Sequence, residues 1–354
     1  MRSVESACKL TINRACSVSV AARFTASIIL LNRVVSSVVI MRSTLKVDFV
    51  KGHMGGNEII LVHGGEIPKQ LRIKAALSLM ESPGVRGDQV GILEKPHERG
   101  DVKVRVIDRT EKTYITMCGG LTQVLPRAFR ETDLGKRYGI GKAFKELALE
   151  TDLGTVRISI RKTKGKMTAH TDMTKFVEEC YHYGVSRIQV GGVDASKVGE
   201  FLVVDVQKLR EKHAAVNFEK MDAEARGILL SMQKDFDRQH LWPNPNAAYS
   251  LFDMYPEDPT HGRVVFPHNI TTGHIEPSCG TGTTAIAVAL VETKRTANGF
   301  ITLRFDSGGG PFLGGPETTE VRMVVENSRV KHAEFSHSLV EITANGKAWL
   351  STLS

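Results

Sequence analysis

Apolar runs of strand length recur through most of the chain and predict a strand-rich protein. They occupy residues 45–50, 59–62, 87–93, 102–107, 155–160, 186–190, 198–205, 263–266, 300–305, 321–325 and 339–342. Helical spacing marks residues 219–239, and the proline-containing segment 242–246 ends it. The pattern therefore favours many short strands with few helices between them.

Two segments combine a cysteine with small residues and an apolar run, as at the start of a buried helix. Cys118 precedes GGLTQVL, and Cys279 precedes GTGTTAIAVAL. Small residues leave the first backbone N–H groups of such a helix open to an anion, and the positive helix end should lower the thiol pKa. The helix after Cys118 should not continue undisturbed past residue 125, because Pro126 removes a hydrogen bond there.

One buried cysteine in a helix cap is often only a small apolar residue. Two cysteines in the same arrangement instead suggest two facing catalytic groups. The order of strand-rich segment and cysteine helix, repeated once, also predicts two similar halves. We expect an N-terminal extension at residues 1–44, a first half at 45–154 and a second half at 155–345, with the last strands free to return to the first half.

Composition narrows the class of protein. The chain has 354 residues, of which 41% are hydrophobic and 24% charged, as is usual for a folded protein. Half of the net charge of +8 lies in the first forty residues, and the other basic residues are interspersed with acidic ones without forming a basic stripe, so we expect no nucleic-acid partner. The five cysteines are widely spaced and do not form a disulfide framework.

The first 44 residues are rich in Ser, Val and Arg and nearly free of acidic residues. They fit either a mitochondrial presequence or an over-extended start in which Met41 is the true first residue. We therefore expect a cytoplasmic protein, or a mitochondrial one if the segment is a presequence. Residues 1–40 should be dispensable for folding, and the apolar run 26–31 is too short for a membrane anchor.

Four motifs occur in the order found in diaminopimelate epimerases. They are HMGGN at residues 53–57, MCG at 117–119, VNF at 216–218 and CGTG at 279–282. The resemblance covers roughly residues 46–345, and the last motif, continued through Thr283, is also similar to that of proline and hydroxyproline racemases. The resemblance to diaminopimelate epimerases implies an α+β fold of two pseudo-symmetric, strand-rich barrel halves. Each half is wrapped around a central helix, and the site lies between the halves.

The resemblance also implies a cofactor-independent inversion at a carbon next to a carboxylate. One thiolate of the pair Cys118 and Cys279 removes the Cα proton, and the opposite thiol returns a proton to the other face. Substrate-binding amides and a carboxylate cradle are implied by the motifs at Asn57, Gly119, Gly120, Asn217, Gly280, Thr281 and Gly282.

Departures from the epimerase pattern concern the distal end of the substrate. Gly119, Gly120 and Leu121 replace the family's Gly-Asn-Gly, and Glu200 follows Gly199 where the family has an Asn-containing turn. Residues 268–276 replace the elements that carry the family's Arg. Because these elements recognise the distal amino-acid end of diaminopimelate, we expect a different acid as substrate.

Three functions remain open at this point. The leading one is a racemase or epimerase of an amino or hydroxy acid. The others are a double-bond isomerase or tautomerase of an unsaturated di- or tricarboxylate, and a non-catalytic binding protein of the same fold. His268 and His274 lack a ligand-spaced partner, so no metal is expected, and His274 should line the cleft or cap a turn. Cys180 should be structural, and a homodimer is left open.

Overall fold

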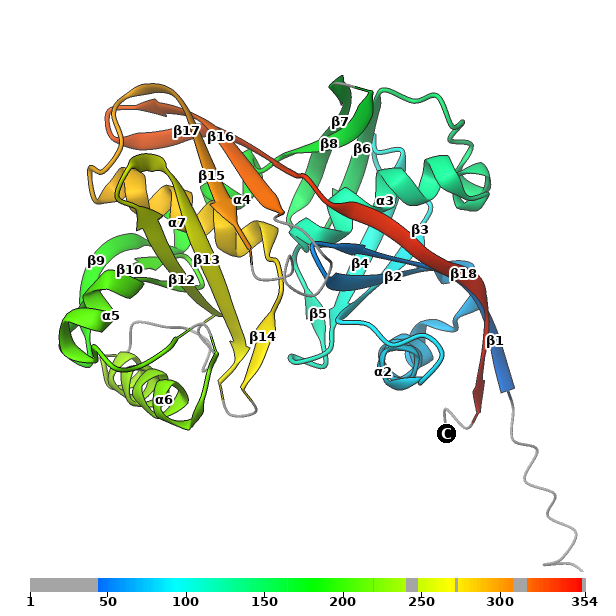
Figure 1. Ribbon diagram of the computed structural model, residues 1–354. Coiled ribbons are helices and arrows are strands. Elements are labelled where there is room, and N and C mark those ends of the chain that lie inside the picture. The colour runs from blue at the N-terminus through cyan, green and yellow to red at the C-terminus, as the bar shows by residue number, and fades with distance from the viewer. Residues whose placement is uncertain are drawn as a thin grey trace, which may run out of the picture. The chain divides into compact units, whose positions relative to one another are not determined.

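The computed structural model describes residues 44–163, 165–218, 220–239, 248–270, 273–307 and 317–351, with the side chains of 163, 268 and 269 left out. The expected extension lies outside these residues except for its last one, as does the proline-containing segment 242–246. Residues Leu45–Ser354 form one compact unit, which Figure 1 shows as a strand-rich assembly. The α+β class predicted from the sequence is confirmed.

The first half contributes eight strands and two longer helices. The strands are β1 (Thr44–Met54), β2 (Asn57–His63), β3 (Gln89–Glu94), β4 (Val102–Asp108), β5 (Tyr114–Ile115), β6 (Glu146–Thr151), β7 (Gly154–Thr163) and β8 (Lys166–Asp172). The helices are α2 (Arg72–Glu81) and α3 (Gly119–Glu131), with short 3-10 turns η1 (Gly64–Glu66), η2 (Lys69–Leu71) and η3 (Leu134–Tyr138).

The second half follows the same plan. Its strands are β9 (Val185–Val190), β10 (Val193–Val198), β11 (Phe201–Asp205), β12 (Ala248–Tyr255), β13 (Asp258–Asn269), β14 (His274–Glu276), β15 (Gly299–Asp306), β16 (Thr318–Glu326), β17 (Arg329–His337) and β18 (Val340–Ser351). Its helices are α4 (Thr174–Tyr183), α5 (Val206–Lys212), α6 (Ala223–Arg238) and α7 (Gly280–Glu292).

Strand pairing shows that the two halves repeat one topology. From β1 through β2, β3, β4, β6 and β7 to β8, successive pairs are antiparallel, parallel, antiparallel, parallel, antiparallel and antiparallel. The path from β10 through β11, β12, β13, β15 and β16 to β17 has the same succession. The short strands β5 and β14 pair antiparallel with β4 and β13 at matching places. The repetition that the sequence order suggested is therefore present in the fold.

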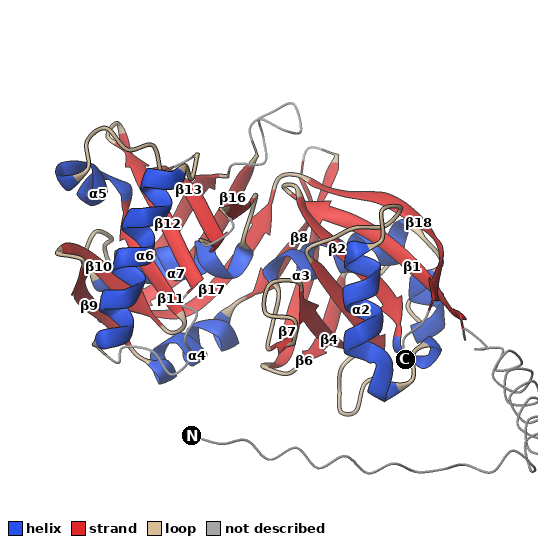
Figure 2. Cartoon of the chain, turned by 90° about the horizontal axis from the view of Figure 1, so that it is seen from below, coloured by secondary structure: helices blue, strands red, loops and turns tan. Residues whose placement is uncertain are grey.

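Each half encloses one of the cysteine helices. Helix α7 is buried along nearly its whole length and packs against β10, β11, β12, β16 and β17. Helix α3 packs against β2, β7, β8 and β18. Figure 2 shows both helices among the strands, whereas α2 and α6 lie on the outside. Apolar burial around α3 and α7 thus fixes where the two cysteines lie.

Two sequence-based boundaries were wrong. Helix α3 continues through Pro126 to Glu131, because Ala128 and Phe129 bury completely beyond the proline and Arg127 pairs with Glu131 at 2.7 Å. This tertiary packing compensates for the missing backbone hydrogen bond. The run predicted as one strand at residues 198–205 is instead the end of β10, a two-residue turn and β11.

The last strand joins the two halves. In Figure 1, β18 leaves the second half and runs along the first, where it pairs with β1. The strands β7 and β8 continue the sheet of the first half, and β8 pairs with β17 of the second half. The unit is therefore bridged by strand pairing.

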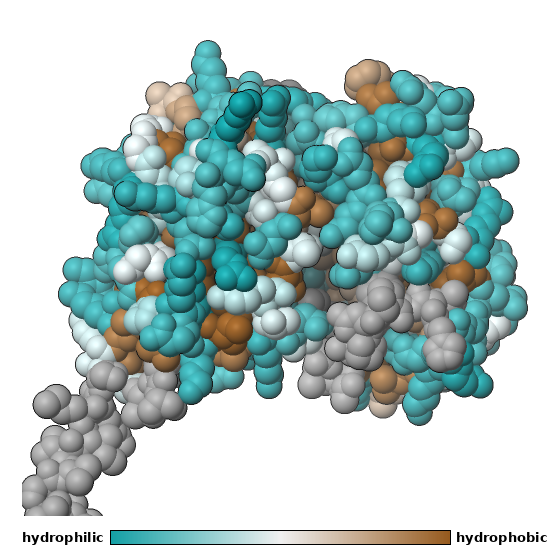
Figure 3. Space-filling model, turned by 180° about the vertical axis from the view of Figure 1, so that it is seen from behind, coloured by the Kyte–Doolittle hydropathy of each residue, from teal (hydrophilic) through white to brown (hydrophobic). Residues whose placement is uncertain are grey.

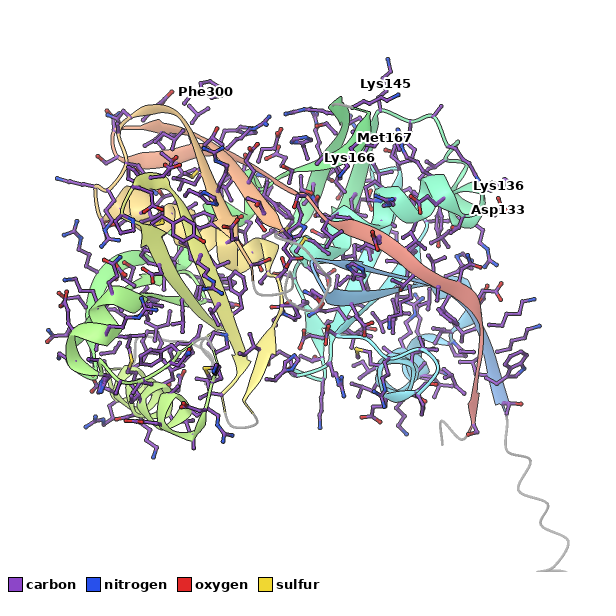
Figure 4. All side chains as sticks on the ribbon, in the orientation of Figure 1. Asp133, Lys136, Lys145, Lys166, Met167 and Phe300 are labelled. Carbon is purple, nitrogen blue, oxygen red and sulfur yellow. The ribbon has the colours of Figure 1, made fainter. Side chains whose placement is uncertain are left out.

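Among the described residues, the exposed large hydrophobic side chains are Met167, Tyr183, Phe300 and Trp349. The face in Figure 3 is mainly hydrophilic, with scattered apolar atoms. The labelled side chains of Phe300, which is 89% exposed, and Met167 project outward from β15 and β8 in Figure 4. No helix in the described residues is long and apolar enough to span a membrane.

Candidate functional site

The two cysteines are the N-cap residues of α3 and α7 and have nearly the same backbone conformation. The φ and ψ angles are −128° and 118° at Cys118, and −134° and 113° at Cys279. Each sulfur accepts a hydrogen bond from the backbone N–H three residues later. The donor is Leu121 for Cys118 and Gly282 for Cys279, at 3.4 Å in both cases. The predicted placement of both thiols at helix starts is confirmed.

The N-terminal ends of the two helices meet. A Cβ atom added to Gly119 would lie 2.8 Å from the Cα of Gly280, so the two backbones are in direct contact. Cys118 and Cys279 both line one cavity of about 290 Å³ beside this contact. The first-turn amides of Gly119, Gly280 and Thr281 have no acceptor within their own helices, and the positive ends of both helix dipoles converge here. This arrangement suits a small anionic group.

Most residues implied by the motifs come together at this cavity. Its lining includes seven of the nine, namely Asn57, Cys118, Gly119, Gly120, Cys279, Gly280 and Thr281. Gly282 does not line it, because its backbone packs against Phe266, 2.8 Å from an added Cβ. Asn217 is exposed and is also absent from the lining. The VNF motif therefore identified a residue that the fold keeps apart from the others.

Glu276 and Asn57 link the two halves at the site. Asn57 is 1% exposed, and its Nδ2 donates to the Glu276 carboxylate and to the backbone oxygen of Ser278 at 3.1 Å. Glu276 stands three residues before Cys279 and is itself buried. Its proximity to the cysteine motif was a signal, but sequence reasoning did not identify it as a site residue.

Gln89 and Asp108 form a second buried pair beside Cys118. Gln89 Nε2 donates to Asp108 Oδ2 at 2.9 Å, and Gln89 Oε1 lies 3.9 Å from the Cys118 sulfur, within reach of its S–H. Both residues line the cavity. They come from the ends of β3 and β4, and no local motif marks them in the sequence.

Burial reverses the thiol acidity that helix position predicts. Desolvation raises the pKa of Cys118 to about 12, with Glu276 and Asp108 adding to the rise. Desolvation also raises the pKa of Cys279 well above its ordinary value, and the neighbouring charge of Glu276 is the next cause. The amides of the helix starts act in the opposite direction but are weaker. Both residues are therefore thiols at neutral pH without a ligand, and the expectation of lowered pKa values was wrong.

The pseudo-symmetry of the fold shows that the site has one polar and one apolar side. Asn57 follows the Gly55–Gly56 turn between β1 and β2, and Phe201 occupies the matching position between β10 and β11. Glu276 stands three residues before Cys279, as Ile115 does before Cys118. All four line the cavity. The pair Asn57 and Glu276 is thus matched on the other side by Phe201 and Ile115.

Negative charge dominates the rest of the lining. Among the described residues the cavity is lined by five carboxylates and by no Lys, Arg or His; the carboxylates are Asp108, Glu111, Glu179, Glu200 and Glu276. Away from the two helix ends, which suit an anionic group, a cavity of this kind favours positive charge in its ligand.

Other residues considered from the sequence have different surroundings. Cys180 is buried and lines the same cavity, but it lies inside α4 and not at a helix start. His274 is exposed, lies 4.0 Å from Asp88 Oδ1 and does not line the cavity. The side chain of His268 lies outside the described residues. Within the described ranges no group of three His, Cys, Asp or Glu residues could hold a metal ion.

Comparisons with known proteins identify the fold. A scan against protein-family profiles found no match, and a search of curated protein sequences also found none. Among solved structures, a hydroxyproline epimerase from Agrobacterium vitis with bound trans-4-OH-L-proline superposes with a TM-score of 0.59 at 16% identity, covering 88% of this chain and 95% of that one. A probable proline racemase from Agrobacterium radiobacter with bound carbonate gives a TM-score of 0.55 at 15% identity, with 85% and 92% covered.

A methylitaconate-delta-isomerase is similar at a TM-score of 0.54 and 13% identity, over 87% of this chain and 96% of that one. Because coverage is nearly complete on both sides, the likeness concerns the whole two-half architecture. This chain therefore has the diaminopimelate epimerase-like fold that its motifs predicted.

Proposed function

We propose that this protein is an isomerase that removes and returns the proton on a carbon next to a carboxylate, with Cys118 and Cys279 as its two acid–base groups. The observation that carries this proposal is that two N-cap cysteines, on helices in contact at Gly119 and Gly280, line one cavity. A carbon acid held between them would present one face to each sulfur.

In the proposed reaction, the substrate carboxylate binds at the helix ends. The thiolate of one cysteine takes the Cα proton, and the electron pair of the broken C–H bond moves into an enolate-like carboxylate. The amides of Gly119, Gly280 and Thr281 stabilise the added charge. The opposite S–H then gives its proton to the other face of the carbon and becomes the thiolate, so the two cysteines exchange roles.

The charge of the cavity favours an amino acid over a polycarboxylate as substrate. Each additional carboxylate on a ligand would meet acidic side chains, with no basic side chain among the described lining residues to offset the repulsion. An α-ammonium group, in contrast, would be attracted by Glu276 and could donate to Asn57 Oδ1, which has no donor among the described residues.

Substrate charge would also activate the thiols. Glu276 raises the pKa of both Cys118 and Cys279 through its negative charge. An ammonium bound beside it would offset that charge and lower both pKa values, which favours formation of one thiolate. The proton could leave by way of Glu276, which is close enough to raise the pKa of the Cys279 thiol.

The test is α-proton exchange in heavy water. The protein would be incubated with proline, hydroxyproline, lysine, diaminopimelate and an unsaturated dicarboxylate, and deuterium incorporation and stereochemistry would be followed by NMR and chiral chromatography. We expect exchange and inversion of an amino acid. Cys118→Ala and Cys279→Ala should each lower the rate about a hundred- to ten-thousandfold, the usual contribution of an acid–base group.

Cys180→Ala is the matched control, because Cys180 lines the same cavity without capping a helix. It should retain exchange. Exchange that is unchanged in both cap variants would refute the cysteine mechanism. Turnover of the dicarboxylate alone would favour the double-bond isomerase, and binding of an amino acid without any exchange would favour the non-catalytic alternative.

A further inference from the structure

The five cavity carboxylates divide into two groups by their electrostatic neighbours. Glu276 and Asp108 are the carboxylates that act on the thiol of Cys118. Glu111 instead acts on Glu200, and Glu200 acts on Glu179. The second group, which we call the acidic trio, consists of Glu111, Glu179 and Glu200. It adds to the negative charge of the same cavity and adjoins the other group at Glu111, whose backbone N–H donates to Asp108 Oδ1 at 3.0 Å.

Both halves contribute to the acidic trio. Glu111 comes from the turn between β4 and β5, Glu179 from α4, and Glu200 from the turn between β10 and β11. None of the three has a salt bridge within the part of the chain that the structure describes. Partial burial and mutual repulsion raise the pKa values of Glu179 and Glu200. The folded protein therefore holds three neighbouring acids together, and none of them is in a salt bridge with a described residue, although His182 acts in the opposite direction on the pKa of Glu179.

Aromatic side chains flank these acids. Phe176 and Phe201 form an edge-to-face pair with ring centroids 5.8 Å apart, and both line the cavity with Tyr183. Such rings pack against the methylene stem of a basic side chain and attract its charged end.

A separate observation indicates that the cavity lacks a donor. Asn57 is 1% exposed and lines the cavity, yet its Oδ1 has no hydrogen-bond donor among the described residues. The orientation of the amide is fixed, because Nδ2 already donates to Glu276 and Ser278. A buried acceptor without a donor is costly, and an ammonium group would satisfy it.

Resting on the proposed function, we propose that the substrate is an amino acid whose side chain carries a second positive charge, which Glu111, Glu179 and Glu200 bind. The α-carboxylate lies at the helix ends, the α-ammonium near Asn57 and Glu276, and the distal ammonium or guanidinium at the acidic trio. The substrate class is thus a basic amino acid of net charge +1.

The experiment compares basic amino acids with neutral ones of similar shape in the full-length protein. Lysine is paired with norleucine and arginine with citrulline, and kcat and KM for α-proton exchange are measured in heavy water. We expect kcat/KM to be roughly tenfold or more higher for a basic member than for its neutral partner, and to fall with added salt.

Variants of the acidic trio test whether these carboxylates cause the preference for a basic substrate. Glu179→Gln and Glu200→Gln should each raise KM for the basic substrate about three- to tenfold while kcat stays within about twofold, and exchange of norleucine should not change. Glu178→Gln is the matched control, because Glu178 is the exposed neighbour of Glu179, pairs with Lys175 at 2.8 Å and does not line the cavity. It should behave as wild type.

Two outcomes separate this inference from the proposed function. Cysteine-dependent exchange that is as fast for norleucine as for lysine, or unaffected in both trio variants, would overturn the inference alone. If no amino acid exchanges, the proposed function fails, and calorimetric binding then decides the inference. Lysine that binds more tightly than norleucine, with the difference lost in Glu200→Gln, would support it; equal binding would overturn it.

Discussion

Gly119 and Gly280 contact each other through their backbones at the point where the two cysteine helices begin. An added Cβ on Gly119 would lie 2.8 Å from Gly280 Cα, and one on Gly280 would lie 3.1 Å from Gly119 Cα and 2.6 Å from the ring of Phe335. No other residue type fits at either position without moving backbone or a buried ring. The glycine after each cysteine therefore sets the distance between the two thiols.

Gly119→Ala should separate the helix ends. We expect the free energy of unfolding to fall by about 1–3 kcal/mol, as is usual for overpacking, together with a large loss of exchange activity. Gly120→Ala is the matched comparison, because its Cβ would meet only ordinary contacts at 3.5 Å or more. That variant should be as stable as wild type or more so, since alanine favours helix. Equal urea unfolding curves for the two variants would contradict this account.

Glu276→Gln should make the cap thiols more reactive. Removing its negative charge lowers the pKa of Cys118 and Cys279, because that charge is one cause of their raised values. More thiolate is then present at a given pH, and alkylation near neutral pH should be up to about tenfold faster. Peptide mass mapping after timed iodoacetamide treatment measures each cysteine separately.

Cys180 is an internal control for the same experiment. Burial, Glu179 and Glu200 raise its pKa, and Glu276 is not among the causes. Its alkylation rate should be the same in wild type and Glu276→Gln. A parallel increase at all three cysteines would instead indicate general loosening of the fold.

His337 should make the protein less stable in mild acid. The ring is 3% exposed, and desolvation lowers its pKa from 6.5 to about 4. Between about pH 6.5 and about pH 4 the unfolded chain binds a proton that the folded protein does not, so stability falls as the pH is lowered through this window. The difference amounts to roughly 3 kcal/mol.

Urea unfolding across that pH window measures the effect. His337→Gln cannot bind the proton and should show a shallower loss of stability with acid than wild type, whatever its stability near neutral pH. His182→Gln, which changes an exposed histidine, should keep the wild-type slope. A wild-type slope in His337→Gln would show that other groups account for the acid sensitivity.

The sequence was informative where the signal is local. Alternating apolar runs located most strands, and a cysteine followed by small residues located the N-caps of α3 and α7. Local chemistry could not show the surroundings of the thiols. The helix ends do favour thiolate, but the depth of burial around Cys118 has the larger effect, and burial depends on the whole fold.

Residues that meet only through the fold were missed for the same reason. Gln89 and Asp108 reach the site from the ends of two different strands, and Glu111 from a turn. Asn217 shows the opposite error, because a short motif matched while the fold left the residue exposed. Pro126 shows a third error. The proline removes a backbone hydrogen bond and was expected to disturb the helix, but packing of the buried Phe129 maintains it.

Asn57→Asp should place two carboxylates in hydrogen-bonding contact, because Asn57 Nδ2 donates directly to Glu276. Two buried carboxylates at that separation cannot both be ionised, so one folded-state pKa must rise above its unfolded value of about 4. The folded variant then binds a proton that the unfolded chain has lost, and its stability should fall as the pH rises from about 5 to about 8. Asn57→Ala, which adds no charge, should lack this slope although it loses the same hydrogen bonds. Urea unfolding of wild type and both variants over this range measures the slope. A flat profile for Asn57→Asp would contradict direct contact between the carboxyl groups at positions 57 and 276 in the folded variant.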